Sequence, residues 1–249
     1  MFRGFGTVVN VATVLVGSGI GVLLGNRLPQ RTRDVVTDGL GLVTLLIGAL
    51  SAAAVRDSRL ASAVGTSAPV LIVLGSLLIG GVAGSLLSVE YRLERFGSRL
   101  QTRLAGGSGS AERRRFVEGF VAASLLFCIG PLTVLGSLSD GLGNGADQLI
   151  LKATLDGFAS IAFAASFGWG VAASALVVAV VQGSLTLIGG LVGGLLPPAQ
   201  LVAITATGGL LLIGVSLRLL QVKPVPVADL LPALAVAPLL TAIIAALRP

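Results

Sequence analysis

The sequence contains no histidine, one cysteine (Cys128) and one tryptophan among its 249 residues. The absence of histidine excludes histidine-dependent triads, histidine zinc sites and histidine-ligated haem. A single cysteine excludes an internal disulfide and any cysteine cluster for a metal. Charged residues make up only 11%, whereas soluble proteins contain about a quarter. An ordinary water-soluble globular domain is therefore excluded.

Apolar residues are abundant, at 54%, and the mean hydropathy is +0.99. A helix needs about 20 apolar residues to cross a bilayer. Runs of this kind lie at Phe5–Gly25, Gly39–Val55, Pro69–Ser88, Phe116–Leu138, Leu149–Phe167, Val171–Leu196, Leu201–Leu220 and Leu230–Leu247. We predict an all-α, polytopic transmembrane bundle of about eight spans in a single membrane domain, residues 1–249. The very short link Gly168-Trp169-Gly170 leaves seven spans as the alternative.

The basic residues are unevenly distributed along the chain. Twelve of the 17 Lys and Arg residues follow the first, third and seventh apolar runs. The positive-inside rule places that side in the cytoplasm, so both termini are predicted outside. The net charge of +6 is then an orientation signal, and we expect no nucleic-acid partner.

The segment 89–115 between the third and fourth runs is predicted to form a cytoplasmic amphipathic loop. Apolar residues recur there at helical spacing, with arginines on the opposite side: Val89, Leu93, Phe96, Leu100 and Leu104 against Arg92, Arg95, Arg99 and Arg103. This pattern favours a helix at anionic lipid headgroups, with a solvated loop as the alternative. Gly106–Ser110 is predicted to be a flexible linker.

Small residues recur four positions apart in three runs. The rows are Thr13, Gly17, Gly21, Gly25; Ser76, Gly80, Gly84, Ser88; and Gln182, Thr186, Gly190, Gly194. Such rows let another helix backbone approach closely, which predicts tight packing within the bundle and is equally compatible with a homodimer.

Two of these runs also resemble each other. Leu15-Val16-Gly17 matches Leu187-Ile188-Gly189, and the same offset of 172 places Asn10 on Gln182. A unit displaced by five helices crosses the membrane in the opposite sense. The match therefore points to an inverted repeat of spans 1–3 and 6–8, an arrangement common in secondary transporters, although glycine-rich sequence also matches by chance.

The fifth run contains charges at membrane depth. Lys152, Asp156 and Ser160 are four residues apart and share one helix face. A charge at this depth costs at least ~2.5 kcal/mol, so Asp156 should find a partner, for which Lys152 is the natural choice. The group is either a structural ion pair or the centre of an ion or proton path.

Other polar residues extend this candidate path. Asn10, Gln182 and Ser124 lie inside predicted spans, although helix-to-helix hydrogen bonding would also explain the two amides. Gly130-Pro131 predicts a kink in the fourth span that frees backbone carbonyls. Secondary candidates are Asp38 and Asp140, expected in exposed caps or turns near span ends, and Glu118, expected in an interfacial ion pair.

Several motifs occur in an order that resembles a known family. They are Gly6-Thr7-Val8-Val9-Asn10, Phe116-Val117-Glu118-Gly119-Phe120, Ala123-Ser124-Leu125-Leu126-Phe127-Cys128-Ile129-Gly130, Asp140-Gly141, Lys152 to Ser160, Gln182-Gly183-Ser184-Leu185-Thr186 and Leu230-Leu231-Pro232-Ala233. Across nearly the whole chain the sequence resembles the YqgA/YdfK-like family of bacterial inner-membrane proteins, a domain of unknown function. Pro131 departs from the small residue that we expect in that family. The resemblance implies a bacterial plasma membrane and a transport role, without substrate or catalytic residues.

We therefore expect a secondary transporter or channel for a small ion or solute, with no cofactor. A non-transporting sensor or scaffold acting through Glu90–Arg115 is the alternative. An intramembrane aspartate protease is disfavoured, because Asp140 is expected at the interface and Gly145-Ala146-Asp147 lacks the glycine–aspartate motif. We thus expect no enzyme.

Overall fold

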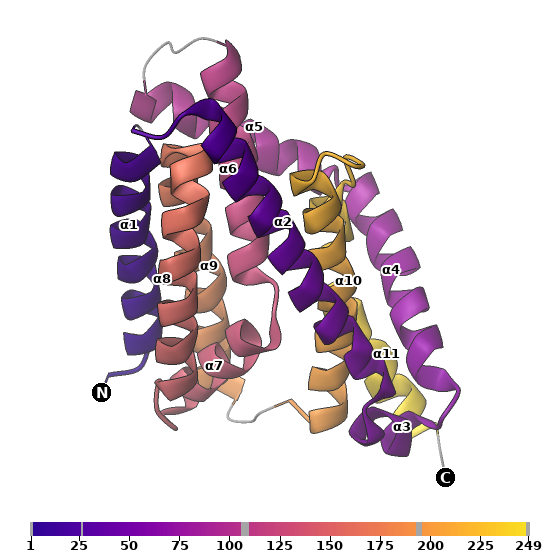
Figure 1. Ribbon diagram of the computed structural model, residues 1–249. Coiled ribbons are helices and arrows are strands. Elements are labelled where there is room, and N and C mark those ends of the chain that lie inside the picture. The colour runs from indigo at the N-terminus through magenta and orange to yellow at the C-terminus, as the bar shows by residue number, and fades with distance from the viewer. Residues whose placement is uncertain (1, 26, 106–109, 193–195, 248–249) are drawn as a thin grey trace. The chain divides into compact units, whose positions relative to one another are not determined.

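The computed structural model describes residues 2–25, 27–105, 110–192 and 196–247, and every regular element within these ranges is helical (Figure 1). The elements are α1 (Phe5–Gly25), α2 (Gln30–Ala52), η1 (Ala53–Arg56), α3 (Ser58–Val64), α4 (Ala68–Leu86), α5 (Val89–Ala105), α6 (Ser110–Cys128), α7 (Pro131–Leu142), α8 (Asp147–Phe167), α9 (Trp169–Val192), α10 (Pro198–Leu219), η2 (Val227–Leu230) and α11 (Ala233–Ala246). The all-α prediction is confirmed.

Among the described residues, seven helices are long and apolar enough to cross a membrane. The number rises to eight if α6 and α7 count as one bent span, with 61° between their axes. This break follows Cys128, where Gly130-Pro131 predicts it. The protein is therefore a multi-pass membrane protein.

Local sequence explains several helix boundaries. Gly168, with φ of 73°, ends α8 and alone separates it from α9, so the predicted short link between two spans is confirmed. Prolines in the first turn begin α4 and α10, where a missing N–H has no cost. The second span differs from its prediction, because α2 begins at Gln30 rather than at Gly39.

The chain packs as two compact units. Unit 1 comprises residues 1–40, 93–128 and 132–195, and unit 2 comprises residues 41–92, 129–131 and 196–249. In unit 1, α1 lies beside α8, and both run in the same direction (Figure 1). A Cβ on Gly17 would overlap the carbonyl of Gly157, and one on Gly21 would overlap that of Ile161. The glycine row of α1 is thus covered by α8, in the close helix packing that such a row predicts.

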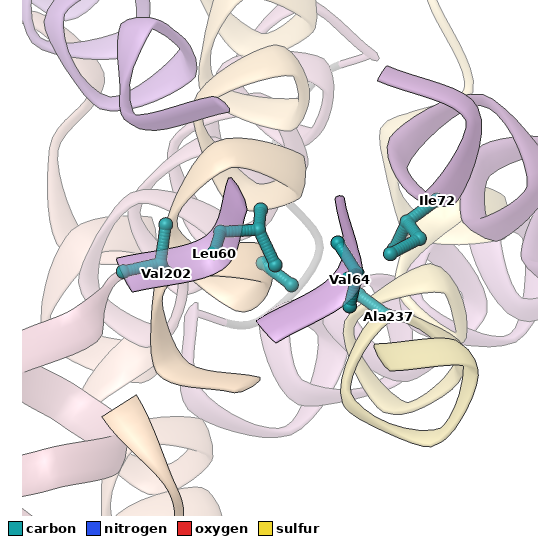
Figure 2. Packing of buried hydrophobic residues seen from close by; sticks show 6 residues of the cluster. Leu60, Val64, Ile72, Val202 and Ala237 are labelled. Atoms are coloured by element: carbon teal, nitrogen blue, oxygen red, sulfur yellow. The ribbon is translucent and has the colours of Figure 1, made fainter. Parts of the chain in front are cut away.

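Unit 2 has its own apolar core, formed by α3, α4, α10 and α11. Figure 2 shows Leu60 and Val64 of α3 among Ile72, Val202 and Ala237, and these side chains are fully or almost fully buried. Gly80 and Gly84 of α4 lie against the backbone of Ala233 and Asp229. A second row of small residues is therefore also engaged within the chain.

Helix α5 covers most of the segment that is predicted to be amphipathic. On its apolar side Gly97 lies against the ring of Phe120, and the Phe96 and Phe120 ring centroids are 5.9 Å apart. On its other side the four predicted headgroup arginines, Arg92, Arg95, Arg99 and Arg103, are exposed. The predicted linker lies outside the described residues except for Ser110, which begins α6.

Candidate functional site

The centre of unit 1 contains an ion pair on α8. Lys152 donates a short hydrogen bond to Oδ2 of Asp156 one helical turn later, as their spacing predicts. The two residues are only 6% and 8% exposed. Since a buried carboxylate is costly unless paired, Lys152 offsets much of the cost of placing Asp156 at mid-depth in a span.

Asn10 of α1 is the second partner of Asp156. Its Nδ2 donates to Oδ2 of Asp156 at 3.0 Å, and the residue is fully buried. This contact depends on Gly17 and Gly21, which let the backbone of α1 approach α8. Asp156 thus accepts hydrogen bonds from two helices, and one of its donors carries a full charge.

Two buried amide groups, one of them hydrogen-bonded to Asp156, have polar atoms without a partner in the described part of the chain. Within the described residues, Oδ1 of Asn10 has no partner, nor does either amide atom of the fully buried Gln182 in α9. The contact between Thr7 and Thr186, 3.4 Å between hydroxyl oxygens, sets the register of α1 against α9. Asn10 and Gln182 each lie one turn from that contact, toward the membrane centre, so they occupy the same level. Buried polar groups are normally satisfied, so these atoms mark a polar site without its partners.

The remaining path residues differ in their state. The hydroxyl of Ser124 on α6 is buried without a partner among the described residues, and so is that of Ser137 on α7, which the sequence did not indicate as a path residue. Ser160 is also buried, but its hydroxyl donates to the carbonyl of Gly157 at 2.8 Å within its own helix. Cys128, at the end of α6, is partly buried and lies within electrostatic range of Lys152 and Asp156.

The secondary candidates are placed differently from one another, and two expectations are wrong. Asp140 is not in an exposed turn: it is 3% exposed and accepts the N–H groups of Gly4 and Gly6, at 3.2 and 3.0 Å. It anchors the positive end of α1, which the sequence could not indicate because 134 positions separate it from Gly6. Asp38 is exposed, but it lies inside α2 rather than at a span end, because α2 begins at Gln30. Glu118 forms the predicted exposed pair, 3.0 Å from Arg114.

No group of three or more Asp, Glu or Cys side chains among the described residues is placed to hold a metal ion. Unit 1 instead contains the Lys152–Asp156 ion pair, with Asn10 hydrogen-bonded to it, and the unpartnered polar atoms of Gln182, Ser124 and Ser137. Polar groups of these kinds can hold a small polar solute, a weakly bound ion or water.

Comparisons with known proteins identify the family of the sequence. The family model described as "Protein of unknown function (DUF554)" matches residues 5–242. The "Uncharacterized membrane protein YdfK" of Bacillus subtilis (strain 168) is 29% identical over 241 residues, covering 96% of each chain. The "Uncharacterized protein YqgA" of Escherichia coli (strain K12) is 30% identical over 232 residues, covering 93% of this chain and 94% of the relative. No solved structure matches.

Proposed function

This chain belongs to the DUF554 family of proteins of unknown function, and on that premise we propose that it is a secondary transporter or channel for a small ion or solute. Its centre is the Lys152–Asp156 pair, and the path runs past Asn10, Gln182, Ser124 and Ser160. The observation that carries the proposal is the unpartnered amide of Gln182. It lies at the level of Asn10, and Asn10 contacts the ion pair.

The working step of the proposed mechanism is exchange at Asp156. Protonation of Asp156 removes its attraction for Lys152, and a cation can likewise take the place of the ammonium group. Either event frees Lys152 and Asn10 to interact with the solute or with the unpartnered atoms around them. The resulting change in packing of α1 against α8 couples binding to a change of access.

Two further features support a transporter. The chain breaks between α6 and α7, and broken helices in membranes line binding sites. Helices α1 and α9, which carry the matching sequences, run in opposite directions, since α1 is parallel to α8 and α9 reverses after Gly168. An inverted repeat requires that orientation, and the repeat itself stays a prediction.

We further propose the bacterial inner membrane as the location, with α5 on the cytoplasmic side and both termini outside. The proposal involves no catalytic step and no cofactor. A homodimer also stays a prediction; it would have to use faces other than the glycine rows of α1 and α4, which are covered within the chain. The alternative of a sensor or scaffold acting through Glu90–Arg115 also stays a prediction; within unit 1, Phe96 and Gly97 of α5 pack on Phe120 of α6.

The test is flux through proteoliposomes under gradients of H⁺, Na⁺, K⁺ and Cl⁻. We expect Asp156→Asn to lose nearly all flux of the conducted ion, whereas the same substitution at the exposed Asp147, on the same helix, leaves it unchanged. A charge exchange, K152D with D156K, retains the pair and controls for folding. Unchanged flux in folded Asp156→Asn protein, or no flux of any of these ions in the wild type, contradicts the ion path.

A further inference from the structure

A separate cavity of about 210 Å³ lies at the other end of unit 1. It is formed by the last turns of α1 and α8 and the first turns of α6 and α9. Its lining combines polar and apolar groups: Arg115, Glu112, Gln101, Trp169, Phe167 and Val22 are among its residues. The cavity is distinct from the Lys152–Asp156 centre, because none of its lining residues belongs to that centre.

Two arginines lie near the end of α8: Arg115 lines this cavity, and Arg33 contacts α8 through its backbone. Arg115 donates from Nε to the carbonyl of Ser166 at 2.5 Å and from a terminal nitrogen to that of Ala165 at 3.3 Å. The backbone of Arg33, in α2, is fixed nearby, because the hydroxyl of Ser166 donates to its carbonyl at 3.3 Å. The Arg33 side chain lies within electrostatic range of Arg115.

The charges at this place do not balance. Glu112, which is exposed, lies within electrostatic range of Arg115, as does the like-charged Arg33. In addition, Nε of Arg33 is buried and has no hydrogen-bond partner in the described part of the chain. A buried donor without an acceptor, beside a like charge, is stabilised by an anion.

The position of the cavity indicates which anion fits. The ends of membrane-spanning helices lie at headgroup depth, and the adjoining Trp169 is 60% exposed, as is typical of interfacial tryptophans. Phe116, Phe167 and Val22 provide an apolar wall next to Arg115. Basic pockets between membrane helices bind phosphate-containing headgroups. We propose that this cavity binds a phosphate group, carried by an anionic phospholipid or free in solution, between Arg115 and Arg33.

Native mass spectrometry of the full chain in detergent tests this inference with dioleoyl phosphatidylglycerol, dioleoyl phosphatidylcholine and inorganic phosphate as separate titrants. We expect phosphatidylglycerol or inorganic phosphate to bind in a saturable manner. Arg33→Gln should weaken that binding about tenfold, which corresponds to ~1.4 kcal/mol. Arg31→Gln is the matched control, because Arg31 is an exposed arginine on the same turn of α2.

The outcomes separate the two sources of phosphate. Saturable binding of phosphatidylglycerol that excess inorganic phosphate does not displace assigns the site to a lipid, and displacement assigns it to free phosphate. Equal binding of phosphatidylglycerol and phosphatidylcholine, with no phosphate binding, overturns the inference. Equal affinities in Arg33→Gln and Arg31→Gln overturn it as well. Arg115→Lys keeps the charge but loses the guanidinium fork, and it should weaken binding without loss of folded protein.

Discussion

Replacing Gln182 by leucine separates a structural role of this residue from a role in transport. Gln182 is fully buried, and neither its Nε2 nor its Oε1 has a partner among the described residues. If the residue serves only packing, leucine should serve as well or better, because it has a similar volume and no polar atoms. If the amide contacts a solute, the same change should abolish transport.

The size of the stability effect follows from the two unsatisfied atoms. Each buried polar group without a partner costs about 1–3 kcal/mol. Polar groups of a chain unfolded within a membrane also find partners, so the lower end of that range applies. We expect Gln182→Leu to raise the free energy of unfolding by about 2 kcal/mol, which corresponds to a Tm increase of about 4–8 °C for a chain of this length.

The assay combines thermal unfolding in detergent with ion flux in proteoliposomes. The matched control is Gln148→Leu, the same substitution at an exposed glutamine of α8, which should change neither quantity. We expect Gln182→Leu to be more stable and inactive. A lower Tm for Gln182→Leu would show that the amide has partners and would refute the argument from unsatisfied atoms. Full flux with a raised Tm would remove Gln182 from the path.

Three further predictions concern packing and anchoring. Gly21→Leu should lower the free energy of unfolding by about 3 kcal/mol or more, because the leucine side chain would overlap the α8 backbone. Gly19→Leu is the control, because nothing lies within 4 Å of the Cβ position of Gly19, and it should leave thermal unfolding unchanged. Asp140→Asn should cost about 1.5–3 kcal/mol and speed amide exchange in the first turn of α1, since it loses a charged acceptor. Hydrogen bonds from Arg59 hold the pKa of the Asp57 carboxyl at about 2, below its ordinary 3.8. The capping of α3 by Asp57 should therefore persist above pH ~4 and be lost as the pH falls toward 2. Amide exchange in α3 measures this loss.

Each of these predictions has a result that would contradict it. Equal stability of the two glycine variants would mean that α1 and α8 are not in backbone contact. Unchanged exchange after Asp140→Asn would mean that the carboxylate does not hold the start of α1. Amide protection factors in α3, corrected for the intrinsic pH dependence of exchange, that do not fall between pH 4 and pH 2 would mean that Asp57 does not cap that helix in solution.

The sequence predicts those features that depend on neighbours along one helix. Bilayer thickness sets the length of an apolar run, so most spans lie close to their predicted positions. The spacing of Lys152 and Asp156 indicates their pairing, because residues four apart share a helix face. The start of α2 was missed because Arg31, Arg33 and Asp34 lower the hydropathy of a helix that continues beyond its apolar part.

Features that depend on contacts between distant segments could not be predicted in this way. The carboxylate of Asp140 binds the start of α1 across 134 positions of the chain, and an Asp-Gly pair by itself indicates only a turn. The bond between Asn10 and Asp156 spans 146 positions, whereas the side chain of Gln182 has no hydrogen-bond partner among the described residues. Which amide is satisfied depends on the register of α1 against α8 and α9, and no local pattern specifies that register.

The parallel pairing of α1 with α8 has a consequence for biosynthesis. Helix α1 is made first, but Asp156 follows Asn10 by 146 residues. At ribosomal rates of about 5–20 residues per second, about 7–30 seconds pass between the synthesis of Asn10 and that of Asp156. During that interval the amide of Asn10 and the glycine face of α1 meet lipid or the insertion machinery rather than α8. Assembly of unit 1 is therefore completed late in translation, and a chain released before α8 lacks the partner that α1 requires.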